Sequence, residues 1–170
     1  MERSGVITFQ GNQLTLLGPA LRPGDKAPDF TLLDNEMKPF GLKDLSGKIK
    51  LMSVTPSLDT PVCDLQLRRF NTEAAGLLGD VMVLNVSMDL PFAIARFCTS
   101  AGIDKAKALS DYRDAAFGLS YGVLIKELRL LGRAIFVVDR SDVIRYIEIV
   151  PEITNHPDYE KAVAAAKQIV

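Results

Sequence analysis

Apolar and polar side chains alternate along the first residues of the chain. The alternation runs through residues 6–10, breaks at Gly11-Asn12 and resumes in a leucine-rich run at 14–17. A repeat of two residues is typical of a half-buried strand, and a short break containing glycine and asparagine is typical of a tight turn. This pattern predicts a β-hairpin with its turn at Gly11-Asn12.

From residue 48 onward, short apolar runs alternate with longer segments in which apolar residues recur every three or four positions. The runs indicate interior strands, and the longer spacing indicates helices. We expect strands at 30–33, 50–55, 81–86, 133–139 and 143–150, and helices at 62–79, from 89 to about 100 and at 157–170. Strands and helices that alternate in this way favour an α/β fold with helices on the faces of a sheet.

Length and composition fit one compact domain spanning residues 1–170, since 48% of the residues are hydrophobic and 24% are charged. Twenty Lys and Arg against 21 Asp and Glu leave a formal charge of -1, which gives no electrostatic reason to expect a nucleic-acid or membrane partner. The longest apolar stretches, at 81–84 and 134–138, are far below the roughly 18 residues of a membrane span. The first five residues have no apolar segment like that of a signal peptide, so we expect a cytoplasmic protein.

The chain has two cysteines, Cys63 and Cys98. Two are too few for a disulfide scaffold, and in a reducing compartment such a pair is more often chemical than structural. They are too far apart in sequence for the C-x-x-C motif of a disulfide oxidoreductase. His156, the single histidine, does not give them the paired spacing of zinc ligands, so we expect no metal, no cofactor and a structural role for His156.

Cys63 follows a predicted strand and a proline-rich loop, and it falls in the first turn of a predicted helix. Unpaired backbone N–H groups and the positive end of the helix dipole favour a thiolate at this position. Thr60 can cap the turn and point its hydroxyl toward the sulfur, and Pro61 suits the first helical position. A lone cysteine is more often a small buried hydrophobe, so the position leaves both interpretations open. The chemical interpretation requires a sulfur that is anionic and accessible.

Pro56, Thr60 and Cys63 form the pattern Pro-x-x-x-Thr-x-x-Cys, which resembles the active-site sequence of peroxiredoxins. The resemblance covers nearly the whole chain and is strongest to the thiol peroxidase branch of that family. Its further elements are the opening hairpin, Ser57-x-Asp59-Thr60-x-Val62-Cys63, Leu90-Pro91-Phe92-Ala93 followed by Arg96-Phe97-Cys98, Arg133-Ala134-x-Phe136-Val137-x-Asp139, and Glu152-Ile153-Thr154 with Pro157-Asp158-Tyr159. The resemblance implies a thioredoxin-like fold, with a central mixed sheet flanked by helices and residues 1–18 as an added N-terminal β-hairpin.

The same resemblance implies a role for each matched residue. Cys63 is expected to be the peroxidatic nucleophile, Thr60 its hydrogen-bond partner, Pro56 a shield for the thiolate and Arg133 the activating cation. Cys98 is expected to be the resolving cysteine. Without the resemblance, an arginine at a strand end is more often solvated, and core packing of Cys98 beside its aromatic neighbour is an equal alternative.

The expected substrates are hydrogen peroxide and alkyl hydroperoxides, with Leu58, Pro61 and Val62 forming an apolar rim around the nucleophile. The resemblance names thioredoxin as the reductant and implies a homodimer, formed through loops around the active site. Because two cysteines on separate helices are too far apart to bond directly, we expect local unwinding in each cycle. A redox sensor or binding module with little turnover remains the alternative, and a general disulfide oxidoreductase is disfavoured by the missing C-x-x-C motif.

Overall fold

A mixed β-sheet forms the centre of the computed structural model, which describes residues 1–77 and 79–170. The elements in chain order are β1 (Glu2–Phe9), β2 (Asn12–Leu17), β3 (Thr31–Leu33), β4 (Pro39–Gly41), η1 (Leu42–Leu45), β5 (Ile49–Val54), α1 (Pro61–Ala75), β6 (Val81–Ser87), α2 (Pro91–Ala101), β7 (Lys107–Ser110), α3 (Ala116–Ser120), β8 (Leu124–Ile125), β9 (Ala134–Val138), β10 (Ile144–Ile149) and α4 (Tyr159–Lys167). The strand order is β10-β9-β5-β6-β7-β3-β4 in the large sheet and β1-β2-β8 in a small one. The prediction of an α/β fold with a central mixed sheet, flanking helices and an N-terminal hairpin is confirmed.

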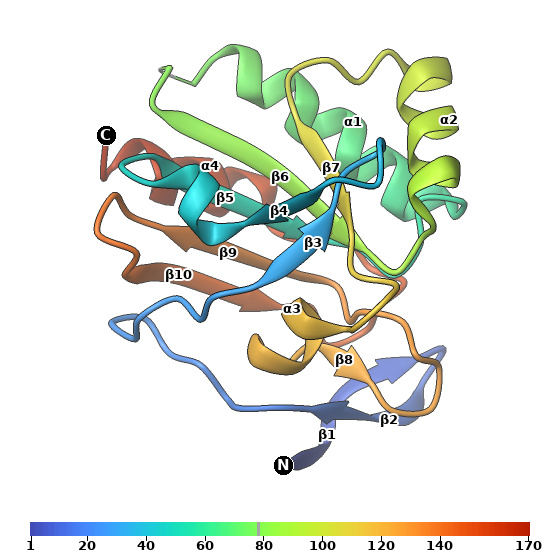
Figure 1. Cartoon of the computed structure of the whole chain (residues 1–170). Coiled ribbons are helices and arrows are strands. Elements are labelled where there is room, and N and C mark those ends of the chain that lie inside the picture. Colours follow the sequence, from blue (N-terminus) through green and yellow to red (C-terminus); the bar gives the residue numbers. More distant parts are fainter. Residues whose placement is uncertain (78) are drawn as a thin grey trace.

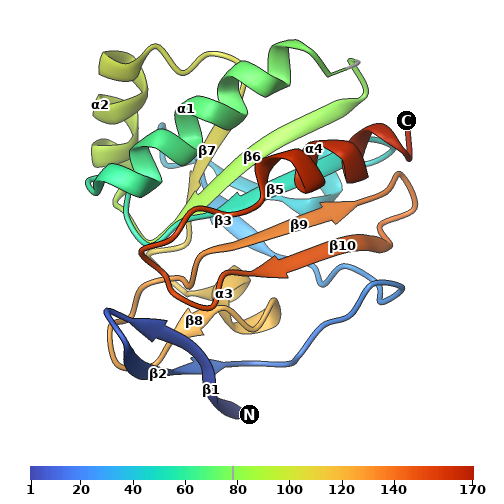
Figure 2. The ribbon, with the colours of Figure 1, turned by 180° about the vertical axis from the view of Figure 1, so that it is seen from behind.

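Strand β5 is buried on both faces of the large sheet, because alternate side chains enter different cores. Ile49 and Leu51 pack on the side covered by α1 and α4, which faces the viewer in Figure 2. Met52 and Val54 pack on the opposite side, where η1 and α3 lie in Figure 1. The apolar run of β5 is therefore that of an interior strand covered by helices on both sides.

The predicted hairpin is present, but its turn lies one residue earlier than expected, at Gln10-Gly11. These residues have φ angles of 50° and 80°, as the tight turn that matches the twist of two paired strands requires. Asn12 already pairs with Phe9 in the ladder, and its side-chain Nδ2 donates to the Phe9 carbonyl at 3.3 Å. Asn12 therefore supports the turn from the first position of β2.

Helix α1 ends earlier than the predicted boundary at Gly79, because the chain leaves the helix at Gly76. The Gly76 N–H donates to the Glu73 carbonyl at 3.0 Å, which closes the last turn. Leu65, which fits the apolar period, is 54% exposed. Leu78, the last apolar residue of the predicted helix, lies outside the described residues.

Helix α4 is also shorter than the predicted segment 157–170, since it begins after Asp158, whose carboxylate caps it by accepting the Lys161 N–H at 3.0 Å. The sequence pattern did not reveal β4, η1, β7 or β8, which span two to four residues each and are too short to show a period. None of the described helices is long and apolar enough to cross a bilayer.

The pairing of β5 with its two neighbours determines what meets at one edge of the sheet. β5 runs parallel to β6, with Val54 opposite Val86, and antiparallel to β9, with Val54 opposite Ala134. The loops that follow β5 and β6 therefore lie beside the residue that precedes β9. That residue is Arg133, and the loop after β5 leads to Cys63.

Candidate active site

Cys63 lies in the first turn of α1, with Thr60 at the N-cap position and Pro61 as the first helical residue. Its sulfur accepts a hydrogen bond from Arg133 Nη2 at 3.4 Å. Both residues are withdrawn from solvent, since Cys63 is 0% and Arg133 2% exposed. A buried guanidinium is costly without polar or charged partners, and the contact places the positive charge of Arg133 directly beside the Cys63 sulfur.

Three further contacts fix the orientation of the Arg133 guanidinium. Nε and Nη2 donate to the Ile153 carbonyl at 2.9 Å and 2.7 Å, and Nη1 donates to Gln66 Oε1 at 2.7 Å. Gln66 in turn donates from Nε2 to Ser53 Oγ at 2.7 Å. Gln66 is not among the residues predicted from the sequence, although a polar residue one helical turn after Cys63 on the buried face was an available signal.

A layer of hydrogen-bonded polar side chains lies next to this arginine in the interior strands β5 and β6. Ser53 Oγ donates to Asn85 Oδ1 at 3.3 Å, and Asn85 Nδ2 donates to Thr55 Oγ1 at 3.1 Å. Among the described residues, each buried side-chain nitrogen and oxygen has a hydrogen-bond partner. Satisfied buried networks are rigid, so Gln66 and the guanidinium are held on a fixed support.

Thr60 does not make the contact expected of it. Its hydroxyl donates to the Ser57 carbonyl at 2.8 Å, and its side chain accepts none of the first N–H groups of α1. The turn at residues 57–60 brings that carbonyl within reach of Thr60, and the hydroxyl satisfies it. The expectation that Thr60 caps the helix and points toward the sulfur is therefore wrong for this conformation. The Thr60 side chain accepts no hydrogen bond from the first N–H groups of α1.

A hollow of about 200 Å³ opens beside the Cys63 residue, and both Thr60 and Arg133 line it. Apolar side chains from the hairpin, the loop before α1 and the loop after β8 dominate its lining: Phe9, Pro56, Pro61, Val62, Leu128 and Leu130. Cys63 itself is fully buried and is not among the residues that line the hollow, so the expectation of an accessible sulfur is wrong for this conformation.

Cys98 lies in the last turn of α2 in different surroundings. It is partly buried against an apolar cluster that includes Leu58, Leu67, Ile94 and Phe97. Burial raises the pKa of the Cys98 thiol. Leu58 is 3% exposed within this cluster, so it is not part of the apolar rim predicted around Cys63. Both cysteines are free thiols in this structure.

Asp89, at the edge of the sheet after β6, joins the surroundings of the two cysteines. Its carboxylate accepts from the Ser57 hydroxyl and the Leu58 N–H, both at 2.7 Å, and from the Ser87 hydroxyl at 2.9 Å. It therefore connects the loop before Cys63 to the start of the helix that carries Cys98. From the sequence, Asp89 was predicted only to start a helix, although its place directly after a buried strand indicated this edge of the sheet.

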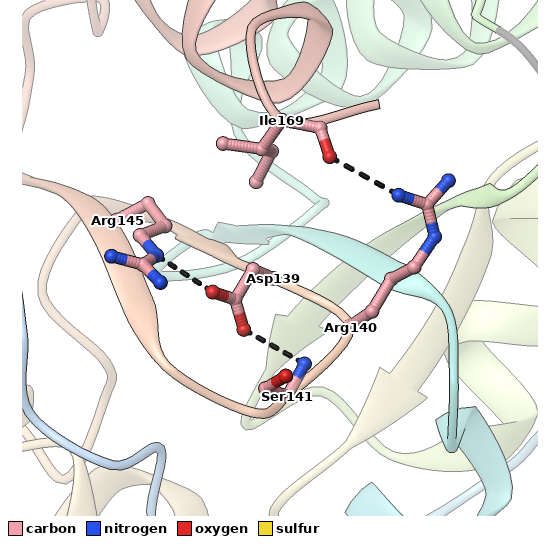
Figure 3. Close-up of a pocket in the computed structure, with 5 residues that line it drawn as sticks. All are labelled: Asp139, Arg140, Ser141, Arg145 and Ile169. Atoms are coloured by element: carbon pink, nitrogen blue, oxygen red, sulfur yellow. Dashed lines mark hydrogen bonds and ion pairs between the residues drawn. The ribbon is translucent and has the colours of Figure 1, made fainter.

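Figure 3 shows a second hollow, of about 380 Å³, beyond the opposite end of β9 from Arg133. Its charged groups are already paired: Arg145 Nε donates to the Asp139 carboxylate at 2.6 Å, and Arg140 Nη1 donates to the Ile169 carbonyl at 3.3 Å. Arg140 Nη2 also donates to Asp80 at 2.9 Å. None of the residues that line this second hollow is a cysteine.

His156 is exposed, and its Nδ1 lies 2.7 Å from the Tyr159 hydroxyl. This contact joins it to the start of α4, which agrees with a structural role. Within the described ranges, no group of three or more His, Cys, Asp and Glu side chains is placed to hold a metal ion.

Comparison with known proteins places the chain in one family. The family model for redoxins matches residues 22–163, and the chain belongs to this family. It is 59% identical to a thiol peroxidase of Halalkalibacterium halodurans over 95% of this chain and 96% of the relative. It is 55% identical to a thiol peroxidase of Bacillus subtilis, over 96% and 98% of the two chains. The resemblance to the thiol peroxidase branch of the peroxiredoxins is confirmed.

The same assignment follows from a solved structure. The crystal structure of a peroxiredoxin-like protein from Aquifex aeolicus superposes with a TM-score of 0.92, at 37% identity and over 98% of each chain. The thioredoxin-like fold expected from the sequence is thereby confirmed.

Proposed function

We propose that this protein is a thiol-dependent peroxidase that reduces hydrogen peroxide and organic hydroperoxides through Cys63. The observation that carries the proposal is the contact of 3.4 Å between Arg133 Nη2 and the Cys63 sulfur, made in the first turn of a helix and beside an apolar hollow. The names of the relatives support the same activity.

In the first step, the Cys63 thiolate attacks one peroxide oxygen. The S–O bond forms as the O–O bond breaks, so that sulfur is oxidised to a sulfenic acid and the peroxide is reduced to an alkoxide or hydroxide, which takes up a proton. A guanidinium has five N–H donors, and the four contacts of Arg133 leave one that can be offered to a peroxide oxygen. A fixed cation at this point stabilises charge that develops on the leaving oxygen.

In the second step, the Cys98 thiol loses its proton and its sulfur attacks the sulfenic sulfur of Cys63. The S–S bond forms as the S–O bond breaks, and the departing hydroxide takes up that proton and leaves as water. The two thiols belong to separate helices and to different packing clusters. We therefore infer that the loop before α1 or the helix α2 unwinds locally before the bond forms. Rapid capture within one chain protects Cys63 from further oxidation.

A dithiol protein then reduces the disulfide by exchange, and its own two thiols become a disulfide. The resemblance names thioredoxin as this reductant. The same resemblance implies a homodimer in which residues 1–170 form one peroxidase domain. Sedimentation velocity of the reduced protein tests the dimer, and turnover with thioredoxin against turnover with glutathione tests the reductant.

The lining of the hollow suggests a preference for hydroperoxides with an apolar substituent. Burying one methylene group is worth about 0.8 kcal/mol, or roughly a fourfold gain in binding. We expect Phe9→Ala and Leu128→Ala to raise KM for cumene hydroperoxide more than KM for hydrogen peroxide. Met37→Ala, a partly exposed residue that does not line the hollow, should change neither. Equal changes for both peroxides would contradict the preference.

The deciding experiment is intact-mass measurement of three chains after one equivalent of hydrogen peroxide. The wild-type chain should lose two hydrogens, Cys63→Ser should not change, and Cys98→Ser should gain oxygen or form an intermolecular link. Steady-state peroxide consumption with thioredoxin and its reductase separates an enzyme from a redox sensor. A single turnover followed by no further consumption would favour the sensor.

A further inference from the structure

The Ile153 carbonyl fixes the orientation in which the Arg133 guanidinium contacts the Cys63 sulfur. It accepts two guanidinium N–H groups, from Nε at 2.9 Å and from Nη2 at 2.7 Å. The same Nη2 donates to Cys63 at 3.4 Å. A shift of this carbonyl would therefore turn the guanidinium away from the sulfur.

Ile153 lies after β10 in a segment outside helices and strands, and the N-terminal hairpin holds it in place. Thr8 N donates to the Pro151 carbonyl at 2.7 Å, and Ile153 N donates to the Thr8 carbonyl at 3.0 Å. The hairpin thus pairs with this segment through a parallel bridge between Thr8 and Glu152. Figure 2 shows β1 and β2 below the large sheet, apart from α1 and α4.

The Glu152 carboxylate closes this pairing at the tip of the hairpin. It accepts from the Thr8 hydroxyl at 2.7 Å and from the N–H groups of Gln10 and Gly11, both at 3.1 Å. It also accepts from the Thr154 hydroxyl at 2.9 Å. The hydrogen bond from Thr8 is the largest of the effects that lower the pKa of Glu152 to about 2.

We propose that Glu152 is a positioning residue for the peroxide reaction, because it joins the hairpin tip to both sides of Ile153 and so keeps the Ile153 carbonyl where it holds Arg133 against Cys63. This inference rests on the role of Arg133 in the proposed function. It makes the N-terminal hairpin a support of the active site as well as part of the hollow, which Phe9 lines.

The hairpin has a second carboxylate contact that serves as a matched control. Glu127 accepts the Thr15 N–H at 3.0 Å, so it also binds the hairpin through a backbone amide. Its contact is to β2, whereas the Arg133-binding segment bonds to Thr8 in β1. Loss of Glu127 should therefore weaken the hairpin without moving Arg133.

The test measures the second-order rate constant for oxidation of Cys63 by cumene hydroperoxide, with Cys98→Ser in all variants to isolate the first step. We expect Glu152→Ala to lower this constant by about ten- to a hundredfold, since small displacements of reacting groups have effects of this size. Thr8→Val, a milder change that removes one donor, should lower it by a smaller factor. Glu127→Ala should stay within about twofold of the parent.

A double-variant comparison separates positioning from general damage to the fold. If Glu152 acts through Arg133, then Glu152→Ala should have no further effect once Arg133→Ala is present. An equal loss in both backgrounds, or an unchanged rate for Glu152→Ala and Thr8→Val, would overturn the inference alone. If Arg133→Ala does not slow the reaction, the proposed role of Arg133 fails first, and the inference fails with it.

Discussion

The two cysteines of this chain occupy opposite ends of two helices. Cys63 lies in the first turn of α1, at the positive end of the helix dipole, and a buried guanidinium lies 3.4 Å from its sulfur. Cys98 lies in the last turn of α2, among leucine, isoleucine and phenylalanine side chains. The positive end of a helix dipole stabilises an anion, and the negative end does not.

The difference teaches that position, and not residue type, makes Cys63 the better candidate for the nucleophile. Burial raises the pKa of the Cys98 thiol, because its apolar neighbours offer no charge or donor to stabilise a thiolate. Cys63 is buried more completely but has a cation held by hydrogen bonds. We therefore expect Cys98 to become reactive only after the local unwinding that brings it to Cys63.

The largest expected effect comes from removing each of the two thiols in turn. Cys63→Ser should abolish peroxide reduction, since Cys98 cannot replace the nucleophile. Cys98→Ser should retain a first oxidation at close to the wild-type rate and lose sustained turnover with thioredoxin. Stopped-flow peroxide consumption measures both, and a fast first oxidation of the Cys63→Ser chain would show that the two environments are equivalent.

Removing the cation should make the surroundings of Cys63 more like those of Cys98. Arg133→Ala is expected to slow Cys63 oxidation by about 10²–10³, the usual effect of losing a donor that stabilises developing charge. Arg140→Ala is a matched control, because Arg140 binds Asp80 and the Ile169 carbonyl far along β9. The measurement is the rate constant for oxidation of Cys63 by one equivalent of hydroperoxide. Equal rate constants for the two variants would remove Arg133 from the mechanism.

Asp89 connects the two environments, so its loss should change the step that joins them. Without this carboxylate the loop at Ser57 and Leu58 separates more easily from the start of α2. We expect Asp89→Ala to speed disulfide formation several-fold, relative to sulfenic acid formation, because local opening costs less. Quenched-flow mass spectrometry measures the two rates. Asp114→Ala, which removes an exposed carboxylate paired with Arg113, should leave their ratio unchanged.

The smallest effect at neutral pH comes from the titration of Glu152, whose proposed role is to support the Cys63 site through Arg133. The pKa of Glu152 is lowered to about 2 in the folded chain, from an ordinary value of 4.5. A lowered carboxyl pKa stabilises the fold above the ordinary value, and this stabilisation is lost as pH falls from 4.5 toward about 2. The Gly11 N–H donates a hydrogen bond to the Glu152 carboxylate, so the NMR chemical shift of this amide proton should report the titration. In Glu152→Gln the Gly11 shift should be flat over this range, and a midpoint near 4.5 in the wild-type chain would contradict the contact.

The fold was predictable where patterns are long enough to show a period. The alternation before Gly11 predicted the hairpin, yet it placed the turn one residue late, because the choice between Gln10-Gly11 and Gly11-Asn12 depends on backbone angles. The helix that carries Cys63 was predicted with its end too late, because local hydrogen bonding at Gly76 ended it before the apolar pattern did.

The site was predictable only as far as residue types form a motif. Cys63, Pro56 and Thr60 belong to a short pattern, and Arg133 followed from the family resemblance. The Ile153 contact could not be foreseen, because a main-chain carbonyl leaves no mark in the residue type. Glu152 and Asp89 were visible as acidic residues, but their partners depend on strand pairing across the chain.

The antiparallel pairing of β5 with β9 also constrains how this protein can change. Val54 opposite Ala134 places Arg133 beside the loop that leads to Cys63, although 70 positions separate the two residues in sequence. A change of loop length between them leaves the face of the sheet that Arg133 occupies unchanged, whereas one extra residue inside β9 would turn the arginine to the other face. We therefore expect a one-residue insertion within this five-residue strand to displace Arg133 from Cys63 more than an insertion in a loop that lines neither residue.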